Sequence, residues 1–187
     1  MKHPLAIFLI FILLVCTIPA QVQTALPNPQ PITQTATVIT PTPTEAMCAF
    51  MEGRQNLKDI SSQLLEKLKN ASLPVKTARA EAYGENCVAA DGSVVRFSAR
   101  ETDYYITLTV ADLQDEAALG ALLEQSLAII NQFPVDQTPG PNPGYVGIGF
   151  ETTADVQNLW FTRQQASDLL AQGMKGAELY RALKGQP

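Results

Sequence analysis

Histidine is almost absent from this chain of 187 residues: the only one is His3, next to the N-terminus. Without histidine, a folded domain cannot build a Ser-His-Asp triad, a Cys-His dyad or a histidine-ligated zinc site. We therefore expect a non-catalytic protein that holds no metal and no cofactor. Carboxylate chemistry, or a serine activated by lysine, remains open to it.

Cysteine is also scarce, and the first of the three lies in a segment typical of export. A short basic start is followed by an apolar run at 5–18 and by the small residue Ala20, which predicts a signal peptide over residues 1–20. The run is shorter than the roughly 20 apolar residues of a membrane span. The alternatives are an uncleaved anchor and lipidation of Cys16, although Val15 stands where a lipobox has a small residue.

Removal or lipidation of Cys16 leaves Cys48 and Cys87 as an even pair, which favours a disulfide in an oxidising compartment. The bridge would close a loop of about 40 residues and stabilise the fold by about 4 kcal/mol on the chain-entropy account. Two buried free thiols are the alternative. The pattern predicts a secreted or cell-surface, extracytoplasmic protein.

Charged residues are missing from residues 21–44, which hold five prolines and seven threonines. Such a segment cannot bury a core and is expected to stay extended. We predict an extracytoplasmic linker over 21–45 and one domain over 46–187, which is long enough for a core of its own. The linker threonines could be glycosylated, but composition does not decide this.

A two-residue alternation runs through 76–110 and predicts a three-stranded antiparallel meander. In its first strand, 76–83, alanines alternate with polar residues, and a helix is the alternative because alanine is a poor strand former. Ala-Asp-Gly-Ser at 90–93 predicts a type I′ hairpin turn. The polar residues 101–103 predict a second turn before the strand 104–110.

A helical period predicts two longer helices. The first runs over 42–70, with a capping box at its start and a leucine stripe along one face. The second runs over 112–133, capped by Asp112 and stopped by Pro134. The proline-rich stretch 134–144 that follows is expected to be a stiff, exposed loop.

The remaining elements are shorter. Alternation predicts strands at 145–153 and 156–162, and a capping box at 162–165 begins a short helix that Gly173 ends. A last helix is predicted at 176–183. The order α-βββ-α-ββ-α-α predicts an α+β fold with two layers: a mainly antiparallel sheet of about five strands, in βββ and ββ units, with helices on one face.

Few patterns in the chain indicate a reaction. The carboxylates on or beside strands could serve a glycosidase-like hydrolase if the fold brought two of them to about 5–9 Å. No spacing singles out a pair among Glu81, Glu85, Glu101, Asp103 and Glu151.

Glycines at 144–149 precede a strand rather than a helix, so they do not form a dinucleotide loop. The acids at 112–116 lack the ligand ladder of a calcium loop, and we attribute the sequon at Asn70 to chance.

Four aromatic residues are the candidate contacts for a ligand or partner. Tyr83, Tyr105, Tyr145 and Trp160 could lie exposed on sheet faces, where rings stack on sugars or fill a partner's pocket. The alternative is that they cover a sheet face or the domain rim. Trp160 is the strongest candidate because it faces away from its apolar neighbours, and tryptophan is enriched at binding hot spots.

We therefore expect an exported, non-catalytic extracytoplasmic domain that binds a cell-envelope component, a glycan or a protein partner. The alternatives are a carboxylate-dependent secreted hydrolase, and an inhibitor or accessory protein of another secreted protein that uses the loop 134–144. The net charge of −5 and the lack of a basic run argue against nucleic acid. A membrane would be contacted only through an uncleaved N-terminal segment or a lipid at Cys16.

Overall fold

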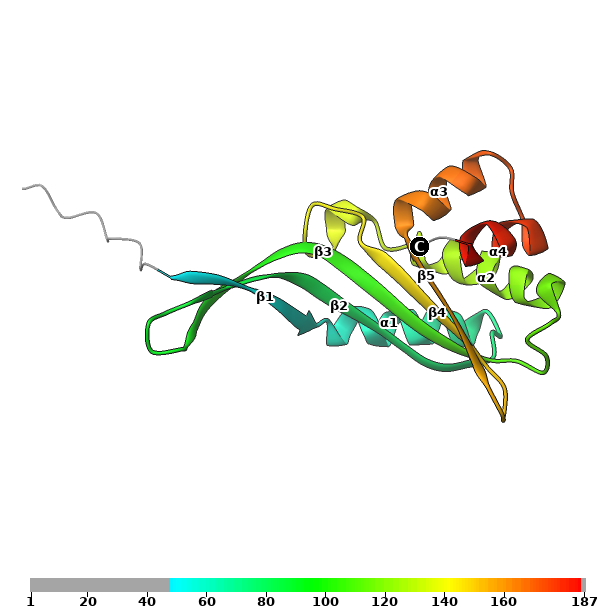
Figure 1. The fold of residues 1–187 in the computed structure, drawn as a ribbon, viewed down its shortest axis with the longest axis horizontal. Helices are drawn as coiled ribbons and strands as arrows, with labels where there is room; N and C mark the ends of the chain where they lie inside the picture. Colours follow the sequence, from blue (N-terminus) through cyan, green and yellow to red (C-terminus); the bar gives the residue numbers. More distant parts are fainter. Residues whose placement is uncertain (1–47, 186–187) are drawn as a thin grey trace, which may run out of the picture. The chain divides into compact units, whose positions relative to one another are not determined.

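The structure is a computed structural model that describes residues 48–185. These residues belong to one compact unit and form a five-stranded sheet with four α-helices on it (Figure 1), so the expected α+β fold is confirmed. The signal peptide and the linker fall outside the described residues. In chain order the elements are β1 (Ala49–Asn56), α1 (Lys58–Asn70), β2 (Val75–Val88), β3 (Val94–Thr109), α2 (Glu116–Ile130), the 3₁₀ turn η1 (Val135–Gln137), β4 (Tyr145–Glu151), β5 (Val156–Thr162), α3 (Arg163–Ala171) and α4 (Gly176–Lys184).

The strands lie side by side in the order in which they occur in the chain, β1-β2-β3-β4-β5. Three of the four neighbouring pairs are antiparallel, and β3 and β4 are parallel. A parallel pair needs a crossover connection, and here α2 and η1 provide it. The sheet is therefore mainly antiparallel, as predicted, with one parallel junction that the sequence did not indicate.

The first predicted helix, 42–70, is wrong over residues 49–56, and its predicted start at 42–47 lies outside the described residues. Residues 49–56 form the strand β1, which pairs antiparallel with β2, and helix α1 begins only at Lys58. Gly53, which weakens a helix interior, lies opposite Gly84 in this pairing. The distant partner strand decides the conformation of 49–56, because strand formation depends strongly on its neighbours.

The predicted turn at 101–103 is also wrong, because β3 runs through it without interruption. Thr102 and Asp103 are buried, and groups from a distant segment satisfy their polar atoms. The hydroxyl of Thr102 donates to the carbonyl of Pro139 at 2.7 Å, and the backbone N–H of Tyr145 donates to the Asp103 carboxylate at 2.9 Å. The third antiparallel strand beside β2 and β3 is β1, so the element order differs from the expected one.

The hairpin turn between β2 and β3 is at the predicted place but has another type. A type I′ turn needs positive φ at both central residues, whereas only Gly92 has one, of 84°. The N–H of Gly92 and that of Ala89 are both bonded, to the carbonyls of Ala89 and Ser93 respectively, each at 2.9 Å. This is the three-residue connection in which a glycine forms a bulge after a type I turn.

One face of the sheet, the covered face, carries the core. Its buried residues are Ala80, Tyr104, Ile106, Leu108, Val146, Ile148, Phe150, Leu159 and Phe161. The helices contribute Leu64 and Leu68 from α1, Leu119, Leu123, Leu127 and Ile130 from α2, and Leu179, Tyr180 and Leu183 from α4. The two predicted leucine stripes are confirmed by this packing, although α2 begins later than expected and is capped by Asp115 rather than Asp112.

The last two helices, α3 and α4, complete the core. The capping box at Thr162 is formed and begins α3, as predicted. Helices α2 and α4 approach so closely at Gly120 that a Cβ atom there would overlap the backbone of Gly176. Tyr180 of α4 is fully buried and its hydroxyl bonds the side chain of Gln157 on β5.

The loop 134–144 is exposed at Pro134, Asp136, Gln137, Pro141 and Asn142, as predicted, and it is also anchored to β3. The N–H of Asn142 donates to the carbonyl of Arg100 at 3.1 Å, and Gly140 lies directly against the backbone of β3. Arg100 is the extra residue of a β-bulge, because Tyr83 pairs with Glu101 while Gly84 pairs with Ala99. The loop therefore supports β3 where that strand bends.

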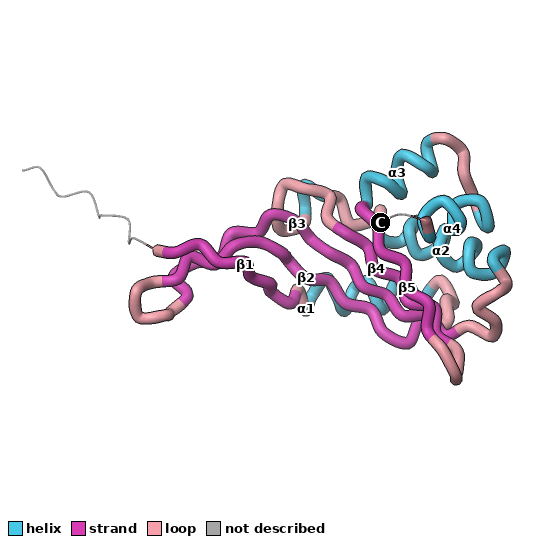
Figure 2. Tube along the Cα trace, in the orientation of Figure 1, coloured by secondary structure: helices cyan, strands magenta, loops and turns pink. Residues whose placement is uncertain are grey.

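The disulfide between Cys48 and Cys87 is present, with the two Cα atoms 5.3 Å apart, and it joins the start of β1 to the end of β2. Near this bridge the ends of β1, β2 and β3 extend beyond the helices as a three-stranded arm (Figure 2). Neither face of the arm is covered by a helix. Its apolar side chains are accordingly exposed: Phe50, Met51, Val94 and Val95.

Candidate functional site

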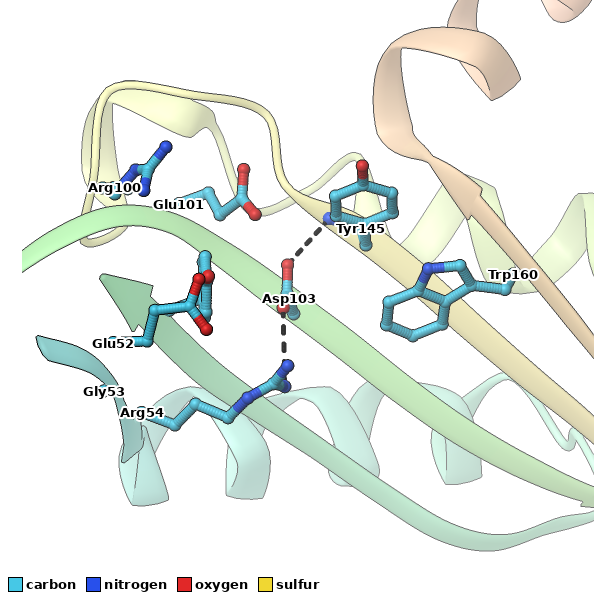
Figure 3. Close-up of a pocket in the computed structure, with 9 residues that line it drawn as sticks. Glu52, Gly53, Arg54, Arg100, Glu101, Asp103, Tyr145 and Trp160 are labelled. Carbon is cyan, nitrogen blue, oxygen red and sulfur yellow. Dashed lines mark hydrogen bonds and ion pairs between the residues drawn. The ribbon is translucent and has the colours of Figure 1, made fainter. Parts of the chain in front are cut away.

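The second face of the sheet, the open face, carries no helix and holds a groove of about 720 Å³. Strands β1, β2 and β3 form one side of this open-face groove, and β4 and β5 form the other (Figure 3). Its lining residues are Glu52, Gly53, Arg54, Tyr83, Arg100, Glu101, Asp103, Tyr145 and Trp160.

Three of the four predicted aromatic contacts lie together at one end of the groove. The rings of Tyr145 and Trp160 are stacked, with centroids 5.3 Å apart, and Tyr105 lies 5.5 Å from Trp160. The guanidinium of Arg79 covers the Tyr105 ring at 3.9 Å, a favourable cation–π distance. Trp160 nevertheless keeps 42% of its surface exposed. We call Tyr105, Tyr145 and Trp160 the aromatic ladder.

A glycine beneath the ladder allows the tryptophan to lie against the sheet. A Cβ atom at Gly147 would come within 2.9 Å of the Trp160 ring and 3.2 Å of the Tyr105 ring. Glycines on one face of a strand allow another backbone or a ring to approach closely. In the structure this space is filled by the Trp160 ring of the same chain, so Gly147 makes room for Trp160.

Asp103 lies in the centre of the groove, between Arg54 and Tyr145 (Figure 3). Its side chain is 3% exposed and accepts a hydrogen bond from the Tyr145 backbone N–H at 2.9 Å. Burial raises the pKa of Asp103 above its ordinary value, while the Tyr145 N–H and the charge of Arg54 oppose that shift. Asp103 thus fixes the start of β4 against β3.

Arg54 spans the groove floor from the edge strand. Its Nη1 donates to the Tyr105 hydroxyl at 2.7 Å and lies 3.5 Å from Glu81 and 3.9 Å from Asp103. The hydrogen bond that Arg54 donates to Tyr105 raises the pKa of Arg54 further, so the guanidinium is charged at any working pH. The groove therefore presents a fixed cation beside its buried acid.

Of the five carboxylates that the sequence offered for catalysis, only two line the same groove. Glu101 shares the groove with Asp103, and burial together with the Asp103 charge raises the pKa of Glu101. Glu81 lies beside the groove, bonded to Arg79 and 3.5 Å from Arg54. Glu85 and Glu151 lie outside the lining, each near a cation: Arg100 at 3.6 Å and Lys76 at 2.6 Å.

The other side of the groove contains residues that the sequence reading did not select. Tyr83, the fourth predicted aromatic, lies there, away from the aromatic ladder, under the guanidinium of Arg54 at 5.2 Å. A hydrogen bond with Glu52 raises the pKa of Tyr83. Glu52 and Arg54 were missed because β1 was taken for a helix, and the two-residue spacing of Phe50, Glu52 and Arg54 was the signal that could have placed them on one strand face. Arg100 lies on β3, where a turn was expected at 101–103.

Within residues 48–185, His, Cys, Asp and Glu side chains do not gather in threes where an ion could be held. None of the helices in that part of the chain has the length and apolar character needed to cross a membrane. Comparisons of the chain with protein-family models, with curated proteins and with solved structures gave no match. The function must therefore be argued from the open-face groove itself.

Proposed function

We propose that this protein is an exported, non-catalytic binding domain whose open-face groove holds a neutral glycan. The observation that carries the proposal is Trp160, which is 42% exposed on the aromatic ladder beside a hollow lined by carboxylates and guanidinium groups. Tryptophan is enriched among the few residues that dominate binding energies.

The chemistry of the groove fits a sugar chain. The C–H face of a pyranose packs on an aromatic ring, while its hydroxyls both donate and accept hydrogen bonds. The groove offers acceptors at Glu52, Glu101 and Asp103 and donors at Arg54 and Arg100. Because acids and bases alternate, the groove has no strong field of one sign, which suits an uncharged ligand better than a polyanion or a polycation.

Export is supported by the disulfide and by the N-terminal sequence. A bridge such as Cys48–Cys87 persists in oxidising compartments and is rare in the cytosol. The apolar run and the linker predicted before Cys48 would then carry the domain to the outside of the cell or hold it there. A glycan of the cell envelope would lie within reach in either case.

The only tryptophan of the chain is Trp160, so tryptophan emission, excited selectively over tyrosine, reports on the groove. The experiment is a titration of the purified protein with soluble oligomers of glucose and of N-acetylglucosamine. We expect a saturable change in emission with at least one of them. Calorimetry should then show that Trp160→Ala weakens binding on the order of tenfold or more.

Val156→Ala is the matched control, because Val156 is also exposed on β5 and points to the same face, at the far end of the strand. This variant should bind as the wild type does. The proposal fails if neither oligomer changes the emission or the heat, or if both variants bind equally well. Capture of a protein partner through Trp160, without any saccharide binding, would replace the glycan by that partner.

A carboxylate-dependent hydrolase is the second candidate, favoured by one observation: Glu101 and Asp103 share the groove and both have a raised pKa, as a general acid requires. The hydrogen bond from Tyr145 and the charge of Arg54 hold Asp103 in a structural role, which ranks this candidate below binding. Reducing ends released from the same oligosaccharides, lost in Glu101→Gln and kept in Glu151→Gln, would establish it.

A further inference from the structure

Strand β1 lies at the edge of the sheet, and no residue among 48–185 pairs with its outer side. Every residue of β1 except Gly53 is exposed. An edge strand offers a row of unpaired N–H and C=O groups to another strand, and proteins blunt such edges with proline, bulges, covering elements or charged side chains, lysine above all. Strand β1 contains no proline and no lysine, and its only charged residues are Glu52 and Arg54.

Alternate residues of β1 point their backbone N–H and C=O groups toward that outer side. The N–H of Leu57, directly after β1, donates inward to the carbonyl of Ala80 at 2.9 Å. In an antiparallel ladder, inward-pointing and outward-pointing residues alternate. Gly53 therefore points its backbone groups inward, toward β2. The residues whose backbone groups point outward are Phe50, Glu52, Arg54 and Asn56.

The side chains of Glu52, Gly53 and Arg54 make this edge complementary to itself. If a second copy of β1 runs antiparallel with the two Gly53 residues opposite each other, Glu52 of each copy faces Arg54 of the other. A shift by two residues in either direction would set Glu52 against Glu52 or Arg54 against Arg54. Opposite charges across a ladder stabilise and like charges destabilise, so charge selects one register.

We propose that the chain forms a two-fold symmetric dimer through its β1 strands, with Glu52 of each copy paired to Arg54 of the other and the axis at Gly53. A closed two-fold contact uses the same surface on both copies, as this one does. The hydrogen bond and the ion pairs of Arg54 within its own chain are made by Nη1, and its guanidinium also covers the Tyr83 ring. A guanidinium has further N–H donors on Nε and Nη2 that can reach a second copy.

The other edge of the sheet does not carry the same pattern. Strand β5 has no charged residue between Val156 and Thr162, so no register of β5 with itself is selected by charge. Helices α3 and α4 also contact β5, whereas β1 extends into the arm away from the helices (Figure 1). The second copy is therefore placed on β1.

This dimer would bring the two open-face grooves onto the same side of one continuous sheet. Glu52, Gly53 and Arg54 line the groove, so each copy would add its edge to the groove of the other. The dimer does not depend on the proposed glycan: it concerns the backbone and charges of β1, and its test measures mass alone. A dimer without saccharide binding, or the reverse, separates the two proposals.

The test is a charge exchange, measured as molar mass by analytical ultracentrifugation of the purified protein. We expect the wild type to be a dimer, and we expect Glu52→Arg or Arg54→Glu alone to raise the dissociation constant on the order of tenfold or more, because both cross-strand pairs become repulsive. An equal mixture of the two variants should form dimers containing one copy of each, and the double variant should dimerise again. Circular dichroism checks that all variants are folded.

Lys69→Glu, on the exposed C-terminal turn of α1, changes the net charge as Arg54→Glu does and should leave the dimer intact. A monomeric wild type would overturn the proposal, and so would single variants that remain dimers. Failure of the mixed variants to associate would also overturn the proposal. Association of the mixture requires folded β1 strands in both variants, so it separates a charge effect from a loss of structure.

Discussion

Two adjacent tyrosines on β3 show how differently the two faces of one sheet are used. Tyr104 is fully buried on the covered face, where its ring lies 5.9 Å from that of Phe133. Tyr105 lies on the open face between Arg79 and Trp160, with its hydroxyl bonded to Arg54. Their sequence neighbourhoods are nearly the same, and only the alternation of the strand separates them.

The difference shows which face can carry function. The covered face is filled by aliphatic and aromatic side chains that pack on α1, α2 and α4. The open face holds charged groups bonded in pairs and a partly exposed aromatic ladder. Side chains can change on the open face without opening a cavity, so binding can evolve there while the covered face maintains stability.

The largest expected effect compares one ring from each face. Phe150→Ala removes a fully buried ring and should lower the free energy of unfolding by about 3–5 kcal/mol, because it leaves a cavity in the core. Trp160→Ala should cost less than about 2 kcal/mol, since much of that ring is already in water. Urea unfolding of both variants measures the difference. Equal losses would show that the open face is as structural as the covered one.

A second comparison concerns the arm, where neither face is covered. Replacement of Cys48 and Cys87 together by alanine should destabilise the domain by about 2–4 kcal/mol, because the bridge restricts the unfolded chain. Hydrogen exchange should rise first in the amides near this end of β1 and β2. If exchange rose evenly over the sheet instead, the arm would be no weaker than the helix-covered part.

A smaller effect tests the space beneath the aromatic ladder. Gly147→Ala must displace the Trp160 ring and should cost about 1–3 kcal/mol while shifting the tryptophan emission. Gly149→Ala is the matched control, because its Cβ would meet the end of the flexible Asn158 side chain at 3.0 Å. We expect that variant to leave the emission unchanged. A similar shift in both would mean that Trp160 is not held by Gly147.

The smallest effect is the pH dependence that Glu101 introduces. A folded-state pKa above the unfolded value means that Glu101 stabilises the fold fully only below its unfolded pKa, and that this contribution is lost as pH rises through the folded pKa. Glu101→Gln should therefore be more stable than the wild type at neutral pH, and the gap should close in acid. Glu66→Gln on α1 is the control. A gap that widens in acid would contradict the sign.

Much of the fold follows from local patterns. Alternation located the strands at both ends of β3 and in β4 and β5, and the capping box at Thr162 marked α3 correctly. The covered stripe of α2 could be predicted because its apolar residues repeat with the helical period. The separation of Trp160 from Leu159 and Phe161 onto opposite faces followed from the two-residue period of a strand and is confirmed.

The predictions that failed concern residues whose structural partners are distant in the sequence. The polar residues Thr102 and Asp103 looked like a turn because nothing nearby could satisfy them, yet Pro139 and Tyr145 do so in the structure. Residues 49–56 looked helical because their strand partner, β2, lies beyond α1. The groove shares this origin: Arg54 and Trp160 line one hollow although they lie at opposite ends of the sheet order.

The contact between α2 and α4 has a consequence for how the chain is made. Helix α4 supplies Leu179, Tyr180 and Leu183 to the core, and it ends at Lys184, one residue after the last of these. Until α4 has left the ribosome, Gly120 has no helix to lie against. Domains are completed only when their final element emerges. The nascent domain should therefore remain open until α4 has emerged, a state that an export channel for unfolded polypeptides can accept.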